Sequence, residues 1–373
     1  DVERSRGLGD VYKRQDKVNL VSREILTGLS VIRAFGREKT EEERFDKANR
    51  DLTKTNLFVN RVMTFMMPVM MLIMYSLTIL IVWVGAHRID GGSMQVGSMT
   101  AFITYAMMIV MSFLMLTMMS VMLPRGSVAA KRIDEVLQTK TSVQETAQPK
   151  HLQDSKGVLT FDHVCFRYPH AEEDALTDLC FTAKPNQTTA IIGSTGCGKS
   201  TLVNLIPRFY DATAGQVMVD GVPVTDYPFS QLRGQIGVVP QQAVLFAGTL
   251  RENMQWRKRD ASDEEISRAL EIAQAAEFVS KLPEGLDTMI QQGGRNLSGG
   301  QRQRLTIARA LVGTPQILIL DDSASALDFA TDAALRKALR QKTRDMTVFM
   351  VSQRAGTVRA ADRIVVLDDG RIV

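Results

Sequence analysis

Two long segments of the sequence contain no Asp, Glu, Lys or Arg, and they limit the fold more than any other feature. One extends over residues 62–87 and the other over residues 91–124. Each is longer than the about 20 mainly apolar residues that a helix needs to cross the roughly 30 Å hydrocarbon layer of a bilayer. We therefore predict membrane-spanning helices over about 62–84 and 99–123. Two buried core helices of a soluble protein are the alternative, and they explain the charge-free length less well.

Charged residues around these spans indicate their orientation. The connection between the spans, about residues 85–97, is short and holds few charges, whereas Lys and Arg gather beyond the other two ends, at Lys54, Arg61, Arg125, Lys131 and Arg132. An excess of Lys and Arg marks cytoplasmic flanks. We expect an integral membrane protein, with the lipid bilayer as a partner and with both of these ends in the cytoplasm.

Methionine is concentrated in the same region. Fifteen of the twenty methionines lie between Met63 and Met122. Methionine is flexible and common at surfaces that accept varied apolar groups, so the spans could line a cavity for small amphipathic cargo. Flexible packing between helices is the simpler interpretation, and the sequence leaves both open.

Composition restricts the remaining function classes. A length of 373 residues suits two or three domains. The net charge of +4 is too small to indicate a nucleic-acid partner, and we expect none. The cysteines, Cys165, Cys180 and Cys197, show no zinc-ligand spacing, which favours free thiols in the reducing cytosol.

Beyond the spans, the hydrophobic pattern changes to short runs typical of strands. Two apolar runs lead directly into polar loops, as buried parallel strands do, so an α/β domain is predicted. A third run mixes strand formers with polar residues. The three runs are residues 188–192, 317–320 and 158–164.

The first of these runs leads into a glycine-rich loop, Gly193-Ser194-Thr195-Gly196-Cys197-Gly198-Lys199-Ser200, which fits the phosphate-binding P-loop pattern. Its glycines let the backbone approach a polyanionic phosphate chain. The pattern assigns Lys199 to the β- and γ-phosphates and the Ser200 hydroxyl to Mg²⁺. A nucleoside triphosphate with Mg²⁺ is therefore the expected ligand.

A second motif, Leu297-Ser298-Gly299-Gly300-Gln301, follows about a hundred residues later. Small residues in front of a helix N-terminus suit anion binding. Together the two motifs resemble the ATP-binding cassette (ABC) family, whose signature is this Ser-Gly-Gly-Gln run. The resemblance covers nearly all of residues 15–373. It implies an exporter-type half-transporter, in which an α-helical transmembrane bundle precedes an α/β P-loop NTPase domain of the ABC type.

The resemblance also assigns roles to individual residues. It implies Mg²⁺ ligation by Ser200, by Gln241 of the Q-loop and by Asp321 at the end of the Walker B strand. It implies that Tyr168 stacks on adenine and that the signature donates hydrogen bonds to a γ-phosphate held by a second domain. The expected ATP-binding residues are Tyr168, Gly193, Ser194, Thr195, Gly196, Cys197, Gly198, Lys199, Ser200, Thr201, Ser298, Gly299, Gly300 and Gln301.

Two positions depart from the family's pattern, and with Gln241 they are the candidate catalytic residues. Asp322 stands where the family usually has a catalytic glutamate, and a misplacement of about 1 Å can cost on the order of 10²-fold in rate. Gln353 replaces the usual switch histidine and cannot become cationic. The pair resembles the degenerate half of a heterodimeric exporter. A second half-transporter is then the expected partner, and the signature of this chain would complete the competent ATP site.

From residue 15 onward, the domain boundaries follow from the same resemblance. Residues 1–14 resemble a translated sequencing adapter and are set aside as non-native. Residues 15–138 are expected to be the C-terminal part of the transmembrane domain, and residues 139–155 a polar linker. Residues 156–373 are expected to be a nucleotide-binding domain truncated at its C-terminus.

Several local elements are predicted within these domains. Residues 28–38 resemble the second intracellular loop of the exporters, which carries a coupling helix. Residues 41–60 should continue into the first span as one helix, which Pro68 could kink. Residues 325–328 resemble the D-loop between the two ATP sites. The runs on either side of Asp369 and Gly370 predict a hairpin over 364–373.

Three other functions remain open at this point. A homodimeric exporter could use Asp322 as a slower catalytic base. A soluble-type ABC ATPase is disfavoured by the fused spans. A regulatory ATP-binding subunit without a transport role is the third alternative, and the cargo itself is not identified, because one fold serves many functions.

Overall fold

The computed structural model describes residues 2–151, 155–323, 326–342 and 345–373. Its contacts divide the chain into two compact units, Asp1–Lys140 and Thr141–Val373. Each unit is described by itself.

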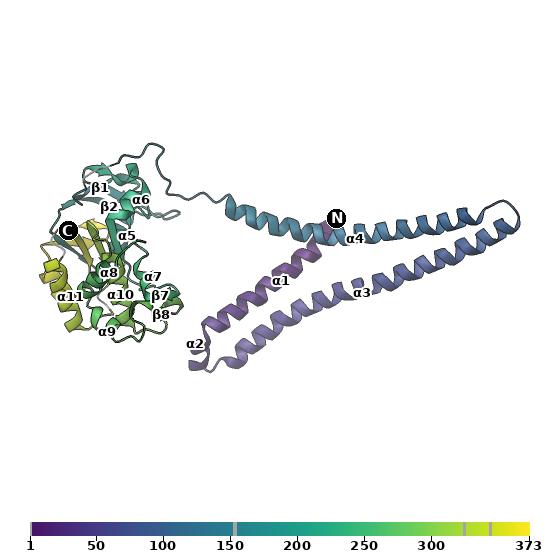
Figure 1. Ribbon diagram of the computed structural model, residues 1–373, viewed down its shortest axis with the longest axis horizontal. Helices are drawn as coiled ribbons and strands as arrows, with labels where there is room; N and C mark the ends of the chain where they lie inside the picture. The colour runs from purple at the N-terminus through teal and green to yellow at the C-terminus, as the bar shows by residue number, and fades with distance from the viewer. Residues whose placement is uncertain (1, 152–154, 324–325, 343–344) are drawn as a thin grey trace. The chain divides into compact units, whose positions relative to one another are not determined.

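The first unit consists of helices in the part that the structure describes. They are α1 (Val2–Thr27), α2 (Leu29–Ala34), α3 (Glu38–Asp90) and α4 (Val96–Leu137). Helices α3 and α4 form a long antiparallel hairpin, which Figure 1 shows with its turn at one end. Both are long and apolar enough to cross a membrane, over Glu38–Asp90 and Val96–Ser120. The expected continuation of residues 41–60 into the first span as one helix is confirmed, and α3 runs on through Pro68.

The connection between the spans is shorter than predicted. Helix α3 continues to Asp90 and α4 begins at Val96, so the prediction of a connection over 85–97 is wrong. Gly85, the first residue of the predicted connection, lies inside α3, where a Cβ would come within 2.8 Å of the Met99 sulfur. The missing side chain lets α4 approach closely. The turn is made instead near Gly92, whose φ of +70° suits glycine.

The segment that resembles the coupling-helix loop contains the short helix α2. Gly36, with φ +59°, ends this segment before α3 begins. Apolar side chains on it are exposed, with Val31 at 59% and Phe35 at 76%. An exposed apolar turn suits a docking role, and that role stays a prediction.

The second unit is built on two main sheets (Figure 1). The larger has the order β12-β11-β3-β10-β9-β6, and its strands are β3 (Thr188–Gly193), β6 (Ile236–Val239), β9 (Ile317–Asp321), β10 (Thr347–Val351), β11 (Arg363–Asp368) and β12 (Arg371–Ile372). The smaller has the order β2-β1-β4-β5, and its strands are β1 (Leu159–Phe166), β2 (Leu176–Ala183), β4 (Ala214–Val219) and β5 (Val222–Pro223). A two-stranded ribbon pairs β7 (Gly248–Thr249) with β8 (Met289–Ile290).

Helices and helical turns connect these strands. They are α5 (Lys199–Leu205), η1 (Val224–Asp226), α6 (Phe229–Gln235), α7 (Leu250–Met254), α8 (Asp263–Ile272), α9 (Ala276–Ser280), η2 (Gly285–Asp287), η3 (Gln292–Gly294), α10 (Gly299–Leu311), α11 (Phe329–Lys342) and α12 (Ala355–Arg359). Ahead of β1, the described part of the predicted linker contacts this unit. Arg208 donates to the Gln144 carbonyl oxygen at 2.8 Å, and the Phe229 amide donates to the Glu145 carboxylate at 2.7 Å.

The strand predictions are confirmed. The runs at 188–192 and 317–320 are the buried strands β3 and β9, which flank β10 and run parallel to it. Of the run at 158–164, residues 159–164 lie in β1, and the hairpin over 364–373 is β11 paired antiparallel with β12. In a parallel sheet all carboxyl ends meet at one edge, and ligands bind beyond that edge. The residues that follow β3, β9 and β10 are therefore brought together there.

Candidate ATP site

The P-loop connects β3 to α5 through three glycines that adopt conformations unfavourable for other residues. Gly193, Gly196 and Gly198 have φ angles of +152°, +91° and +98°. At Gly198 there is also no room for a side chain, because a Cβ would lie 2.7 Å from the Leu176 side chain and 2.8 Å from the Ala175 carbonyl oxygen. At Gly196 a Cβ would meet nothing within 4 Å. The loop is thus pinned against the start of β2 while its tip is open.

Gly198→Ala is expected to lower the free energy of unfolding by about 1–3 kcal/mol more than Gly196→Ala, the usual cost of overpacking. The two glycines have nearly the same φ, +98° and +91°, so the backbone strain is matched and only the contacts differ. Denaturant unfolding of the two variant proteins measures the difference. Equal stabilities would contradict this account of the loop.

Lys199, the first residue of α5, is held by the loop itself. Its ammonium group donates to the carbonyl oxygens of Gly193 at 2.9 Å and Ser194 at 2.5 Å. These bonds place a positive charge directly over the loop, where the phosphates of a nucleotide would lie. A lysine so placed is suited to bind the β- and γ-phosphates.

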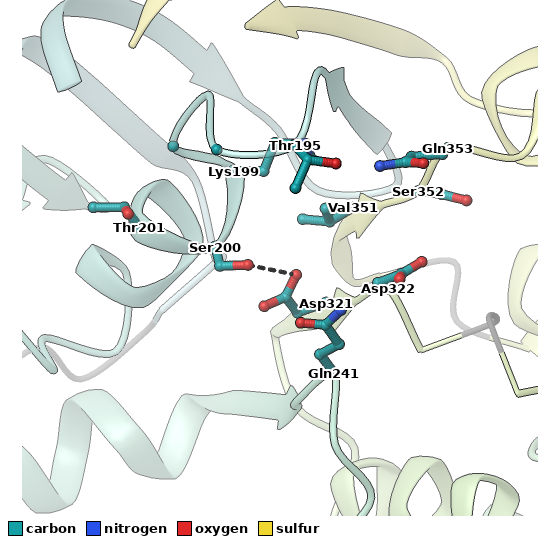
Figure 2. Close-up of a pocket in the computed structure, with 12 residues that line it drawn as sticks. Thr195, Lys199, Ser200, Thr201, Gln241, Asp321, Asp322, Val351, Ser352 and Gln353 are labelled. Atoms are coloured by element: carbon teal, nitrogen blue, oxygen red, sulfur yellow. Dashed lines mark hydrogen bonds between the residues drawn. The ribbon is translucent and has the colours of Figure 1, made fainter. Parts of the chain in front are cut away.

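Ser200, in helix α5, and Asp321, at the end of strand β9, bring oxygen ligands together from two elements distant in sequence. The Ser200 hydroxyl donates to the Asp321 carboxylate at 3.2 Å, as the dashed line in Figure 2 shows. Burial raises the pKa of Asp321 and the negative charge of Asp322 adds to this, whereas the hydrogen bond from Ser200 and the charge of Lys199 lower it. A hydroxyl and a buried carboxylate at the end of a strand are ligands that Mg²⁺ prefers, so these residues fit the ion.

Asp321→Asn is expected to raise the melting temperature of the nucleotide-free protein at neutral pH and to abolish the extra stabilisation by Mg²⁺ with ATP. A carboxyl whose pKa is raised on folding contributes stability below its ordinary value of 3.8 and loses it as the pH rises through the folded value. At neutral pH the ionised Asp321 is therefore destabilising until a cation offsets it. Thermal unfolding with and without Mg²⁺–ATP measures both effects, and a lower melting temperature without nucleotide would refute the first.

One cavity of about 270 Å³ collects most of the predicted site residues. Figure 2 shows Gln241 beside Asp321, with Thr195 and Gln353 together on another side of the cavity. The residues that line it are Thr195, Gly196, Gly198, Lys199, Ser200, Thr201, Gln241, Asp321, Asp322, Val351, Ser352 and Gln353. They come from the P-loop, the Q-loop and the ends of β9 and β10, as the parallel sheet requires.

The two departures from the family's pattern both line this cavity. Asp322 has a left-handed backbone, with φ +44°, and its amide donates to the Val351 carbonyl oxygen at 3.0 Å. Aspartate tolerates this conformation better than most residues. Gln353 is exposed at the cavity. Asp322 and Gln353 can therefore both reach a ligand there.

Ser352 and Val351 also line the cavity, although the sequence analysis did not assign them to the site. The Ser352 amide donates to the Ile191 carbonyl oxygen at 3.3 Å, and its hydroxyl accepts a hydrogen bond from the Arg354 amide at 3.1 Å. These bonds hold the segment that carries Gln353 against β3. Their place directly before Gln353, at the end of a buried strand, was the signal that could have identified them.

Tyr168 lies beside the site without being among the described residues that line the cavity. Its hydroxyl is 3.0 Å from the hydroxyl of Thr201 in α5, and its ring packs edge-on against Phe166 and Tyr210. The ring is half-buried. Stacking of Tyr168 on adenine stays a prediction, and the hydrogen bond to Thr201 is an additional contact between the segment after β1 and the P-loop helix.

The signature residues form the start of α10 and are separate from this cavity. The Ser298 hydroxyl accepts a hydrogen bond from the Gln301 amide, and the Gln301 side chain accepts one from the Ser298 amide at 2.9 Å. Such a capping box leaves the hydroxyl proton of Ser298 available to another acceptor. None of the described residues 297–301 lines the 270 Å³ cavity. Of the predicted D-loop, Ser325 lies outside the described residues.

Comparison with known proteins agrees with this arrangement. Residues 176–325 match the family model for the ABC transporter, and residues 10–113 match that for the ABC transporter transmembrane region. An uncharacterized ABC transporter ATP-binding protein of Mycobacterium tuberculosis H37Rv is 44% identical over 362 residues, which are 96% of this chain and 62% of the relative. The ATP-dependent lipid A-core flippase of Haemophilus ducreyi is 34% identical over 366 residues, which are 98% and 62% of the two chains.

A solved structure shows the same fold. A bacterial Atm1-family ABC exporter with ATP bound superposes with a TM-score of 0.85 at 28% identity, over 100% of this chain and 67% of the other. The chain spans about 62% of the length of the curated relatives described above. The two family-model matches and the shared fold show that the chain is an ABC transporter chain, in which a transmembrane region is fused to an ATP-binding domain in the fold of an ABC exporter.

Proposed function

We propose that this chain is one half of an ATP-driven exporter that moves amphipathic or apolar molecules across a bacterial plasma membrane. The observation that carries the proposal is the cavity of Lys199, Ser200 and Asp321 in the same chain as two helices long enough to span a membrane. Relatives include a probable multidrug resistance ABC transporter of Bacillus subtilis, which is 36% identical over 349 residues, and the lipid A-core flippase above.

Different residues of the cavity have different roles in binding and hydrolysing ATP. The P-loop and Lys199 bind the phosphates, while Ser200 and Asp321, with Gln241 beside them, hold Mg²⁺. The ion neutralises charge on the phosphates when it is bound. Asp322 and Gln353, which line the same cavity, would orient the water molecule that attacks the γ-phosphate. Aspartate is shorter than glutamate, and Gln353 cannot carry a positive charge. The contributions of both residues to hydrolysis are therefore weaker in this chain.

The position of Ser298 supports a site shared between two chains. It lies outside the cavity, exposed at the start of a helix, with a hydroxyl proton free to donate. A second ATP-binding domain is therefore needed to bring a phosphate to it. In the proposed heterodimer the signature of this chain completes the partner's ATP site, which hydrolyses ATP, and the cavity of this chain mainly retains its nucleotide.

Transport is tested in sealed vesicles that contain the full-length protein and its partner half-transporter. ATP-dependent movement of a fluorescent amphipathic dye or a labelled lipid is expected, and it should stop when Ser298 is replaced by Ala. Ser262→Ala is the matched control, because Ser262 forms the same capping box at the start of α8. ATP hydrolysis without movement of either probe would instead support a regulatory ATP-binding subunit.

The full-length subunit alone is expected to bind ATP but to hydrolyse it slowly. The phosphate-binding residues are present, whereas Asp322 and Gln353 replace the residues that usually support hydrolysis. Nucleotide binding and steady-state turnover of the purified subunit measure this. Turnover as fast as that of an exporter homodimer with glutamate and histidine at these positions would favour the homodimeric alternative, in which Asp322 is a competent base.

A further inference from the structure

A β-bulge in the smaller sheet gathers three potential metal ligands, none of which lines the nucleotide cavity. The register of β1 against β2 shifts between Phe161 and Val164, so that Asp162 and His163 lie opposite the single residue Cys180. A bulge of this kind turns a side chain that would face the core to the other side of the sheet. His163 accordingly has φ +48°, a conformation that histidine tolerates better than most residues.

The neighbouring strand accommodates the bulge. Gly215, at the start of β4, has φ +72°, and a Cβ there would lie 2.1 Å from the His163 carbonyl oxygen. Only glycine fits against the bulge at this point. The bulge is therefore matched on both sides, by the register of β2 and by a glycine of β4.

The three side chains share the solvent-exposed face of the sheet. Their strand neighbours Phe161, Val164, Leu179 and Phe181 are buried on the other face. One ligand atom from each of Asp162, His163 and Cys180 lies within 4.8 Å of the other two. Bonds of about 2.0–2.3 Å to a tetrahedral ion correspond to ligand separations of about 3.3–3.7 Å. Exposed side chains can close the remaining distance of about 1 Å by small rotations.

A fourth residue orients the histidine. The Asp178 carboxylate, from β2, is 2.6 Å from Nδ1 of His163. A carboxylate that accepts the proton of one ring nitrogen fixes the tautomer, orients the ring and increases the basicity of the other nitrogen, as in most metal-binding histidines. Asp178 is thus a positioning residue in this cluster.

The donor set indicates which ion fits. A thiolate and an imidazole exclude Mg²⁺ and Ca²⁺, which prefer oxygen ligands, and suit Zn²⁺. Cysteine remains a reduced thiol in the cytosol, where it is available to a metal ion. We propose that Asp162, His163 and Cys180 form a Zn²⁺ site that ties β1 to β2, with a solvent molecule as the fourth ligand. Cysteine spacing alone could not predict it, because the ligands are of three types on two strands.

The site is tested by alkylation of the full-length, reduced and metal-free protein, with each cysteine followed by mass spectrometry. Zn²⁺ is expected to slow alkylation of Cys180 at least tenfold, whereas Mg²⁺ should have no effect. Cys165 is an internal control, because it lies on β1 outside the cluster. No protection of Cys180 by Zn²⁺, or equal protection of Cys165, would overturn the proposal.

Variants distinguish the loss of a metal ligand from damage to the fold. His163→Asn keeps a residue that tolerates the left-handed backbone and should abolish protection of Cys180. His170→Asn is the matched control, since His170 also has a positive φ, +67°, and should leave protection unchanged. Asp178→Asn should weaken Zn²⁺ binding by about 10- to 100-fold, as loss of an orienting partner does. Full protection in His163→Asn would overturn the assignment. ATP turnover should stay unchanged in all three, because none of these residues lines the nucleotide cavity.

Discussion

Replacing Ser298 with Ala is expected to lower ATP turnover of the assembled transporter by about 10²- to 10³-fold, the usual effect of removing one donor that stabilises a transition state. In the proposed heterodimer, the Ser298 hydroxyl donates to the γ-phosphate of ATP bound by the partner. That is the site where hydrolysis occurs. The change removes the hydroxyl and leaves the cavity of this chain intact.

Loss of the helix cap is a second consequence of this substitution, and it has to be separated from the first. Replacement of an N-cap serine by alanine costs about 1 kcal/mol of stability. Ser262 caps α8 with the same reciprocal hydrogen bonds, so Ser262→Ala reproduces this loss far from any phosphate. The control should lower the melting temperature in a similar way and leave turnover nearly unchanged.

Lys199→Ala changes this chain's own ATP site, whereas Ser298→Ala changes the site of the partner. It removes the cation from the cavity of this chain, which in the proposal mainly retains ATP. Nucleotide retention in this cavity should fall. Turnover of the pair should fall less than with Ser298→Ala, because the partner's site is affected only indirectly, through closure of the two ATP-binding domains. Steady-state ATPase of the purified pair with each change separately is the measurement. If Lys199→Ala abolished turnover and Ser298→Ala had almost no effect, the roles of the two sites would be reversed.

The sequence predicted the elements that a short pattern can encode. Lys199 and Ser200 begin α5 directly after the P-loop, and Asp321 ends β9. The order of the strands in a parallel sheet brings these positions to one edge, so motif spacing was enough to expect them together. The hairpin around Gly370 and the continuous helix into the first span were also predictable from short stretches of sequence. Each depends on local periodicity or on turn residues near in sequence.

Contacts between elements distant in sequence were not predictable in this way. The predicted connection between the spans began at Gly85, but the role of this glycine depends on the approach of Met99 from the next helix. The hydroxyl contact between Tyr168 and Thr201 depends on how the segment after β1 packs beside α5. The cluster at Cys180 depends on a one-residue shift in strand register. Register is a property of two strands together, and neither strand's sequence specifies it alone.

Replacing both Asp322 with Glu and Gln353 with His is expected to raise hydrolysis at this chain's own site by about 10²-fold or more, since a positioned base contributes about 10²- to 10⁴-fold. The glutamate carries its carboxylate one methylene further toward the γ-phosphate, and the histidine can become cationic. Each single variant should give a smaller gain. Single-turnover hydrolysis of ATP bound to this chain, in the assembled pair, measures the change.

The same double variant has a cost that appears in stability and not in rate. Asp322 has φ +44°, where an aspartate side chain is better tolerated than a glutamate. The ground state and the transition state share this backbone, so the strain should lower the melting temperature slightly without slowing hydrolysis. Gln353→His alone, which does not alter that position, is the control for stability. ATP affinity should be unchanged in every variant, because Lys199 and the P-loop remain as they are. Loss of ATP binding would show that Asp322 and Gln353 hold the nucleotide cavity together, contrary to the assignment of both to the hydrolytic step.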